Sequence, residues 1–166
     1  MNTILGIIGL IGIITGVLLP EASRSQKLTL LVANIIMLVF SCIDGNVYYI
    51  ALEIVVVVGS VGPFLPVAES KAGGLTLMTA IVVLAMLISG GLITNKLELI
   101  GAIGLILLAI GFAISNPWPM LFGSICIAIF SGYSFYHVRE AISGVFALLN
   151  VVFFFSCGYA CLRRGR

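Results

Sequence analysis

The sequence predicts an all-α integral membrane protein with seven transmembrane helices. Of its 166 residues, 61% are hydrophobic and only 8% are charged, and the mean hydropathy is +1.29. An ordinary soluble domain carries about a quarter charged residues, so the polar surface of this chain is too small to keep it in water. Apolar runs separated by short polar breaks recur along the whole sequence, and many are about long enough to cross a hydrocarbon core of ~30 Å.

The predicted spans follow one another with little sequence between them. In chain order they are Thr3–Leu19, Leu28–Ile43, Asn46–Pro66, Leu75–Thr94, Leu97–Ser115, Trp118–Tyr136 and Ala141–Leu162. The sixth span begins with prolines, which the first turn of a helix tolerates, and with Trp118, which suits the headgroup boundary. None of the polar breaks could hold an independent domain. We therefore expect the protein to act in or beside the lipid bilayer.

Lysine and arginine predict the orientation, because they gather in cytoplasmic loops. With the N-terminus outside, the cytoplasmic side receives Arg24, Lys27, Lys71, Arg163, Arg164 and Arg166. The outer side then receives only Lys96 and Arg139. We expect a bacterial inner (plasma) membrane location, with the N-terminus outside and the C-terminus in the cytoplasm.

The two halves of the chain resemble each other. Three glycines of the first span align with three of the fifth, namely Gly6, Gly9 and Gly16 with Gly101, Gly104 and Gly111. Polar residues of the next spans also align, namely Asn34 with Ser124, Ser41 with Ser131, and Glu53 with Asn150 to within one residue. These matches share one chain order, so we predict a duplication. Residues 1–66 would form a first three-helix repeat, residues 67–96 a linker helix, and residues 97–166 a second, parallel repeat.

This 3-1-3 order resembles the SWEET-type superfamily, which includes the nicotinamide riboside (PnuC) vitamin transporters. The segment Asn116-x-Trp118-Pro119, with Gly123 and Tyr133 further on, is similar to the Asn-x-x-Trp-Pro-x-Gly…Tyr segment of the PnuC family. Asn116 stands one residue nearer the tryptophan than in that pattern. The resemblance implies a vitamin or nucleoside-like substrate that moves by facilitated diffusion, with Trp118 as the aromatic residue of its site.

Glu53 is the sharpest candidate for a functional residue. It lies ~10 Å inside the third predicted span, and Val55–Val58 follow it. An ionisable group at that depth is costly and usually faces a cavity or a partner. One interpretation is a substrate contact or a protonatable coupling group. The alternative is a protonated or hydroxyl-bonded carboxyl that only fastens helices together.

Other polar residues inside the spans complete the predicted substrate-binding site, which comprises Glu53, Asn34, Asn150, Ser41, Ser124, Ser131 and Trp118. Each also has a structural interpretation. An intramembrane asparagine often serves only to join helices, and a serine hydroxyl often bonds to its own helix. Four tyrosines near the outer ends of spans are attributed to an aromatic belt, namely Tyr48, Tyr49, Tyr133 and Tyr136.

Several classes of function are disfavoured. His137 is the only histidine, so neither a bis-histidine haem site nor a zinc protease motif can be built. We predict no catalytic, cofactor or metal site, and no binding of nucleic acid, since the formal charge is only +2. The four cysteines lie in apolar runs and are expected to be free.

The preferred hypothesis is a small secondary transporter or facilitator that moves a small polar solute by alternating access between the repeats. The alternative is a non-transporting subunit that packs in a larger membrane complex. A cavity bounded by both repeats would favour the transporter, and a solid core with a flat apolar flank would favour the subunit. The expected partners are the solute and the lipid bilayer. The sequence leaves open whether the chain also forms a homo-oligomer.

Overall fold

Helices make up almost all of the chain in the computed structural model, which describes residues 2–19, 23–66, 69–113 and 116–164. The elements are α1 (Asn2–Leu18), α2 (Arg24–Asp44), α3 (Val47–Val61), the 3₁₀ turn η1 (Gly62–Phe64), α4 (Glu69–Ser89), α5 (Lys96–Ala113), α6 (Pro117–Val138) and α7 (Ala141–Arg164). The described residues contain no strand. The prediction of an all-helical chain is therefore confirmed.

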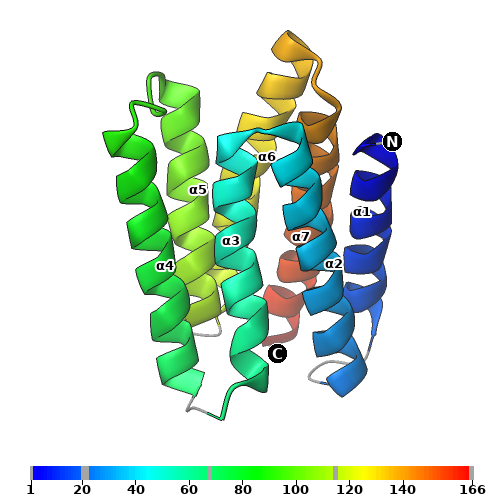
Figure 1. The fold of residues 1–166 in the computed structure, drawn as a ribbon. Coiled ribbons are helices and arrows are strands. Elements are labelled where there is room, and N and C mark those ends of the chain that lie inside the picture. The colour runs from blue at the N-terminus through cyan, green and yellow to red at the C-terminus, as the bar shows by residue number, and fades with distance from the viewer. Residues whose placement is uncertain (1, 20–22, 67–68, 114–115, 165–166) are drawn as a thin grey trace.

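The helices run up and down in chain order, and each packs against the next (Figure 1). In addition, α1 packs on α7, and α3 contacts α5 directly although α4 lies between them in sequence. Within the first three helices α2 lies between α1 and α3, and among the last three α6 lies between α5 and α7. We call the end that holds the α2–α3, α4–α5 and α6–α7 loops the upper end, and the opposite end the lower end (Figure 1).

Side-chain caps and left-handed residues set the ends of several helices. Asn46 caps α3 by accepting a hydrogen bond from the Tyr48 amide, and Asn116 caps α6 in the same way through the Trp118 amide. Gly45 ends α2 with a φ of 76°, a left-handed conformation that glycine adopts without strain. These caps lie in or beside the polar breaks seen in the sequence, which explains why those breaks predict helix ends well.

Two predicted spans differ from the observed helices by five residues or more at an end. The third was expected to continue to Pro66, but α3 ends at Val61 and the chain turns through η1. Pro63 is the reason, because proline has no N–H to donate and clashes with the preceding turn. The fourth was expected over Leu75–Thr94, whereas α4 begins at Glu69 and ends at Ser89. Polar residues can extend a helix beyond an apolar core, and Gly91, with a φ of 67°, follows the end of α4.

Glycines at matching positions allow α1 to pack closely against α2, and α5 to pack closely against α6. A Cβ added to Gly6 would meet the Phe40 ring, and one added to Gly101 would meet the Phe130 ring. Lower in each pair, the neighbours of Gly16 and Gly111 are Leu30 and Met120. Small residues of this kind allow the close helix contacts that are common between apolar helices. The α1–α2 and α5–α6 pairs are thus built alike.

Five helices are long and apolar enough to cross a membrane, and they lie within Arg24–Asp44, Val47–Phe64, Lys71–Ser89, Pro117–Val138 and Ala141–Tyr159. The apolar stretch of α1, Thr3–Gly16, is shorter. The predicted end of the fifth span at Ser115, and Arg166 of the predicted cytoplasmic charge cluster, lie outside the described residues. The chain is a helical bundle whose apolar helices are compatible with a membrane protein.

Candidate functional site

The interior of the bundle contains several polar side chains among its apolar ones. The buried polar residues of the described chain are Asn34, Ser41, Glu53, Thr76, Ser124, Ser131, Ser143 and Asn150. Six of the seven residues predicted for the site are in this set. The seventh, Trp118, is 53% exposed in the first turn of α6. The structure therefore does not bring Trp118 together with the buried residues.

Glu53 is only 1% exposed, and α3 carries it into the apolar core. Its Oε2 atom has no hydrogen-bond partner, and no charged group of the described residues acts on its carboxyl group. A buried carboxyl without a partner costs several kcal/mol if ionised and less if it holds a proton. An apolar side chain at this position would therefore stabilise the fold better than Glu53 does.

The face of α3 that carries Glu53 also carries Tyr49 and Ser60. These residues are spaced by four and seven positions, so their side chains lie above one another along one side of the helix. At the lower end of this face, the Asn34 amide of α2 donates to the Ser60 hydroxyl at 2.7 Å, and Ser60 donates to the Val56 carbonyl at 2.8 Å. The side-chain oxygen of Asn34 has no partner. This bond joins α2 to α3 but leaves the side-chain oxygen of Asn34 without a hydrogen bond.

Tyr49 forms the upper part of the same face. Its ring stacks on Phe146 of α7, with ring centroids 4.2 Å apart. The hydroxyls of Ser131 on α6 and Ser143 on α7 lie beside the Tyr49 hydroxyl, yet none of the three makes a hydrogen bond of normal geometry. The assignment of Tyr49 to an aromatic belt is therefore wrong, because this side chain is 1% exposed and faces the core.

All the unpaired buried side-chain atoms of the described residues lie on or against this face of α3. We call the group the polar row; it consists of Tyr49, Glu53 and Ser60 of α3 with Asn34, Ser131 and Ser143 of the neighbouring helices. Buried polar atoms without a partner are rare in folded proteins and each one needs an explanation. Five of them along one helix face mark the polar row as the candidate site.

The other predicted residues are satisfied within their own helices. Ser41 donates to the Met37 carbonyl at 2.9 Å, Ser124 to the Leu121 carbonyl at 2.8 Å, and the Asn150 amide to the Phe146 carbonyl at 2.9 Å. The site predicted from the sequence lacked Tyr49, Ser60 and Ser143. The spacing of Tyr49 four residues before Glu53 was the available signal, since it places both on one face.

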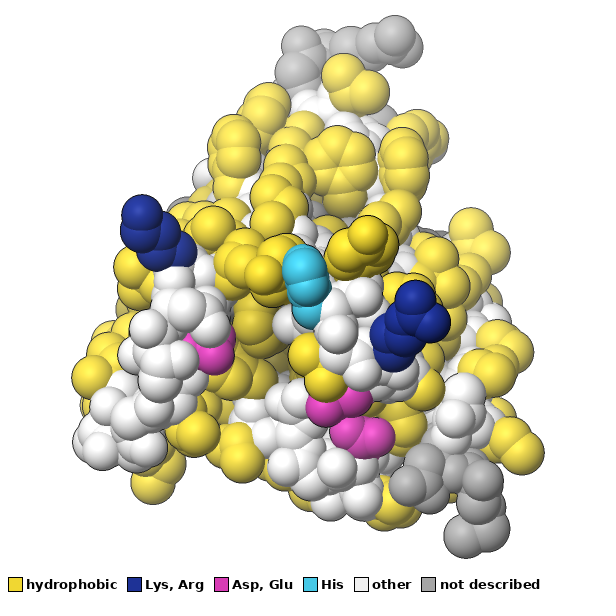
Figure 2. Space-filling model, turned by 90° about the horizontal axis from the view of Figure 1, so that it is seen from above, with side chains coloured by type: hydrophobic (Ala, Val, Ile, Leu, Met, Phe, Trp, Pro, Cys, Tyr) yellow, Lys and Arg dark blue, Asp and Glu magenta, His cyan; other side chains and the backbone are white. Residues whose placement is uncertain are grey.

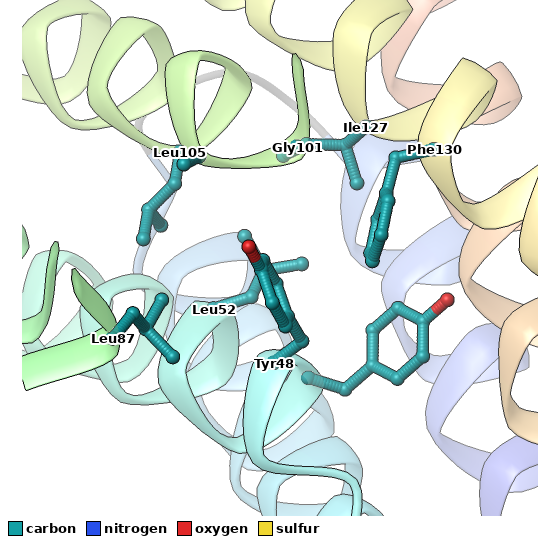
Figure 3. Close-up of a pocket in the computed structure, with 9 residues that line it drawn as sticks. Tyr48, Leu52, Leu87, Gly101, Leu105, Ile127 and Phe130 are labelled. Atoms are coloured by element: carbon teal, nitrogen blue, oxygen red, sulfur yellow. The ribbon is translucent and has the colours of Figure 1, made fainter. Parts of the chain in front are cut away.

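A small cavity lies beside the polar row, between α3, α4, α5 and α6 (Figure 3). Its volume is about 20 Å³, enough for a single water molecule. Tyr48, Tyr49, Leu52, Leu105, Ile127 and Phe130 are among the residues that line it. None of the seven predicted site residues does so. The cavity is nevertheless bounded by helices of both predicted repeats.

An acidic depression lies above this cavity at the upper end of the bundle. It has a volume of about 340 Å³, and Asp44, Asn46, Tyr48, Glu98 and Glu140 are among its lining residues. Figure 2 shows the acidic side chains of this end set among apolar surface. Tyr48 lines both spaces, and its hydroxyl donates to the Glu98 carbonyl at 3.1 Å. One tyrosine therefore separates the depression from the cavity.

The Asn34–Ser60 bond provides a direct test of the lower part of the polar row. A double-mutant cycle with Asn34→Leu and Ser60→Ala should give a coupling of ~0.6 kcal/mol, because hydrogen bonds between membrane helices average that value. The measurement is reversible unfolding of each variant in mixed micelles. Additive effects of the two substitutions would show that the bond contributes nothing to the stability of the bundle.

Comparisons with protein-family models, with curated proteins and with solved structures found no match for this chain. Among the described residues, no group of three histidine, cysteine, aspartate or glutamate side chains could hold a metal ion. The fold defines the chain as an all-helical bundle with several apolar helices, and the polar row with its adjoining cavity is the feature that function must explain.

Proposed function

We propose that the chain is a small integral membrane transporter with its lower end in the cytoplasm. The distribution of charge supports this orientation. Among the described residues, Lys96 and Arg139 are the only lysine and arginine of the upper end, while the lower end receives Arg24, Lys27 and Lys71 together with the end of α7. An excess of basic residues is typical of the cytoplasmic side of membrane proteins. The first residues of α1 would then face the outside.

We further propose that the bundle is a duplication of three helices joined by α4. The matching glycine contacts of α1 on α2 and α5 on α6 support this relation. So does the position of α2 and α6, each in the middle of its own trio. α4 packs against both α3 and α5, as expected of a linker helix that joins two trios. Parallel repeats of this kind typically hold their substrate near mid-membrane, between the two halves.

The substrate of the proposed transporter is a small polar solute, of the vitamin or nucleoside class, that moves by alternating access. The polar row carries this proposal. A bundle that only supports its own fold gains nothing from burying a carboxyl group whose Oε2 has no partner and an asparagine whose side-chain oxygen has none. A solute with donors and acceptors would supply the missing hydrogen bonds when the two trios separate. The cavity and the depression at the upper end mark the seam along which they would part.

One feature favours the second candidate, a non-transporting subunit. A groove of about 450 Å³ lies between α6 and α7, and its lining includes Trp118, Leu121, Phe154, Phe155, Tyr159 and Leu162. Hydrophobic grooves can bind the apolar face of an amphipathic helix. A helix of a partner protein could occupy it, and the chain would then act by packing rather than by transport.

Uptake into liposomes separates the two candidates. Purified protein would be reconstituted and tested with radiolabelled nicotinamide riboside, uridine and glucose. We expect saturable uptake of at least one solute, which Glu53→Gln reduces to the level of protein-free vesicles. Thr76→Val is the matched control, because Thr76 is equally buried but bonds to the Ala72 carbonyl of its own helix at 3.1 Å. A folded protein that moves none of the three solutes would favour the subunit.

A further inference from the structure

We propose that Tyr48 is the outer gate of the bundle. Its side chain closes the way from the acidic depression to the cavity between the two trios, and it opens that way by rotating toward the depression. This inference rests on the proposed transport function and names the residue that controls access from the outside. The position of Tyr48 between two spaces, the weak contacts that hold it there and the room that it has to move carry the inference together.

Tyr48 lies between two spaces of the bundle. Of the described residues, it alone lines both the acidic depression of about 340 Å³ at the upper end and the cavity of about 20 Å³ beneath it. Figure 3 shows its ring between Leu87 and Leu105 on one side and Phe130 on the other. Removal of this one ring would therefore join the cavity to the depression.

The contacts of Tyr48 join the two trios at the upper end. Tyr48 belongs to α3, its hydroxyl donates to the Glu98 carbonyl of α5 at 3.1 Å, and its ring packs on Phe130 of α6 with centroids 5.0 Å apart. Nearby, the Asn46 amide donates to Oε2 of Glu140, between α6 and α7, at 3.3 Å. Each of these hydrogen bonds replaces one to water, so its net contribution to stability is small. They close the upper end without locking it.

Tyr48 has room to move, whereas the Phe130 ring does not. Tyr48 is the second residue of α3, so no preceding helical turn blocks its side-chain rotamers. A change of rotamer can carry the ring into the depression, which is far larger than the cavity. The ring of Phe130 is held against α5, because a Cβ added to Gly101 would lie 2.9 Å from it. The moving part of this seam is therefore Tyr48.

Rotation of Tyr48 would open a space that both trios bound. Leu52 of α3 lines the cavity from the first trio, and Ala102 of α5 and Ile127 of α6 line it from the second. A solute in the depression could then enter the seam between the trios. In the structure the Tyr48 hydroxyl is bonded and the two spaces are separate. This conformation is therefore closed to the outside.

Labelling of a cysteine placed in the cavity tests the gate without any knowledge of the solute. Ala102 lines the cavity and is 2% exposed, so Ala102→Cys places a small thiol below Tyr48. The probe is trimethylammonium-ethyl methanethiosulfonate, a membrane-impermeant cation, added outside sealed proteoliposomes. Mass spectrometry of peptides gives the labelling rate of each cysteine. Reconstitution inserts the protein in both directions, so the result does not depend on the proposed orientation.

Substitutions of Tyr48 in the Ala102→Cys protein should speed the labelling of the introduced thiol. A buried thiol reacts only in the open form, so its rate measures how often the gate is open. We expect Tyr48→Ala to raise the rate by an order of magnitude or more, because the ring no longer blocks the way. Tyr48→Phe should raise it several-fold, since it removes only the bond to the Glu98 carbonyl.

Leu52→Ala is the matched control. Leu52 lies one helical turn below Tyr48 and lines the cavity but not the depression, so its loss enlarges the cavity and leaves the gate in place. Its rate should stay close to that of Ala102→Cys alone. Equal rates with and without the Tyr48 ring, or an equal acceleration by Leu52→Ala, would overturn the proposal.

Cys157 reports whether each variant folds, because it is buried on α7 and should stay unlabelled throughout. Should Tyr48→Ala also expose Cys157, the outcome is decided by Tyr48→Phe, which keeps the ring that packs on Phe130. A rate for Tyr48→Phe equal to that of Ala102→Cys alone would then overturn the proposal.

Solute uptake distinguishes this inference from the proposed function. Uptake by a protein whose labelling rate is independent of Tyr48 would leave a transporter that opens elsewhere, and the gate would be disproved. A labelling rate that follows Tyr48 in a protein that moves no solute would leave a mobile tyrosine over the cavity, in a chain with another role.

Discussion

Substitution of Gly123 by alanine is expected to separate α5 from α6 and to lower the thermal stability strongly. A Cβ at this position would lie 2.8 Å from the Gly104 carbonyl oxygen and 2.9 Å from the Leu108 amide nitrogen. Both are backbone atoms, which cannot rotate away, so the helices themselves must move apart. Overpacking of this kind typically costs ~1–3 kcal/mol and sometimes more.

Gly132 on the same helix is the matched control for Gly123. A Cβ at Gly132 would meet nothing within 4 Å. Alanine is favoured over glycine inside a helix by ~1 kcal/mol, so Gly132→Ala should leave the stability unchanged or raise it. Thermal unfolding in detergent, followed by circular dichroism, measures both variants. Equal melting temperatures would show that α5 and α6 are not in backbone contact at Gly123.

Replacement of Glu53 by leucine is expected to have the opposite effect, raising stability while removing function. Leucine has a similar size and leaves no unpaired oxygen in the core, where Glu53 is 1% exposed and its Oε2 has no partner. Even a buried ion pair can often be replaced by apolar residues of similar volume with no loss of stability or with a gain of ~1–4 kcal/mol, and Glu53 has no counterion to lose. Such a trade between stability and activity is common at functional sites.

The Glu53→Leu prediction is tested by thermal unfolding together with solute uptake. Asn150→Leu provides the comparison. The Asn150 amide already donates to the Phe146 carbonyl at 2.9 Å, so replacing Asn150 should raise the stability less than replacing Glu53. A lower melting temperature for Glu53→Leu than for the wild type would mean that the carboxyl group holds the bundle together. In that case Glu53 would be structural, and its functional interpretation would be wrong.

Most of the helices could be predicted from hydropathy, because a long apolar run without charge has few stable alternatives. The ends were less predictable. Hydropathy placed the start of the fourth helix at Leu75, but Lys71, Gly73 and Gly74, which precede Leu75, are also helical. Charged and small residues can belong to a helix wherever it leaves the apolar core. Proline gives a firmer signal in principle, yet the prediction carried the third helix past Pro63, although α3 stops just before Gly62-Pro63.

The candidate site could be predicted from the sequence only at residues whose type and neighbours indicate that the side chain is buried. A carboxyl in a run of valines, as at Glu53, must face the interior, and the structure places it there. Tyr49 carried no such signal, because an aromatic side chain near a helix end can face either the headgroups or the core. The helices around such a side chain decide whether it faces the headgroups or the core. Here the ring of Phe146 and the serines of α6 and α7 turn it inward.

The contact between α1 and α7 has a consequence for biosynthesis. Because α1 packs on α7, part of the surface of α1 has no protein partner until α7 has been synthesised and inserted. During that interval the open flank of α1 must be covered by lipid or by the insertion machinery. A ribosome that stalls before α7 would release a bundle that cannot close, and quality-control proteases could recognise such an incomplete product by that bare flank.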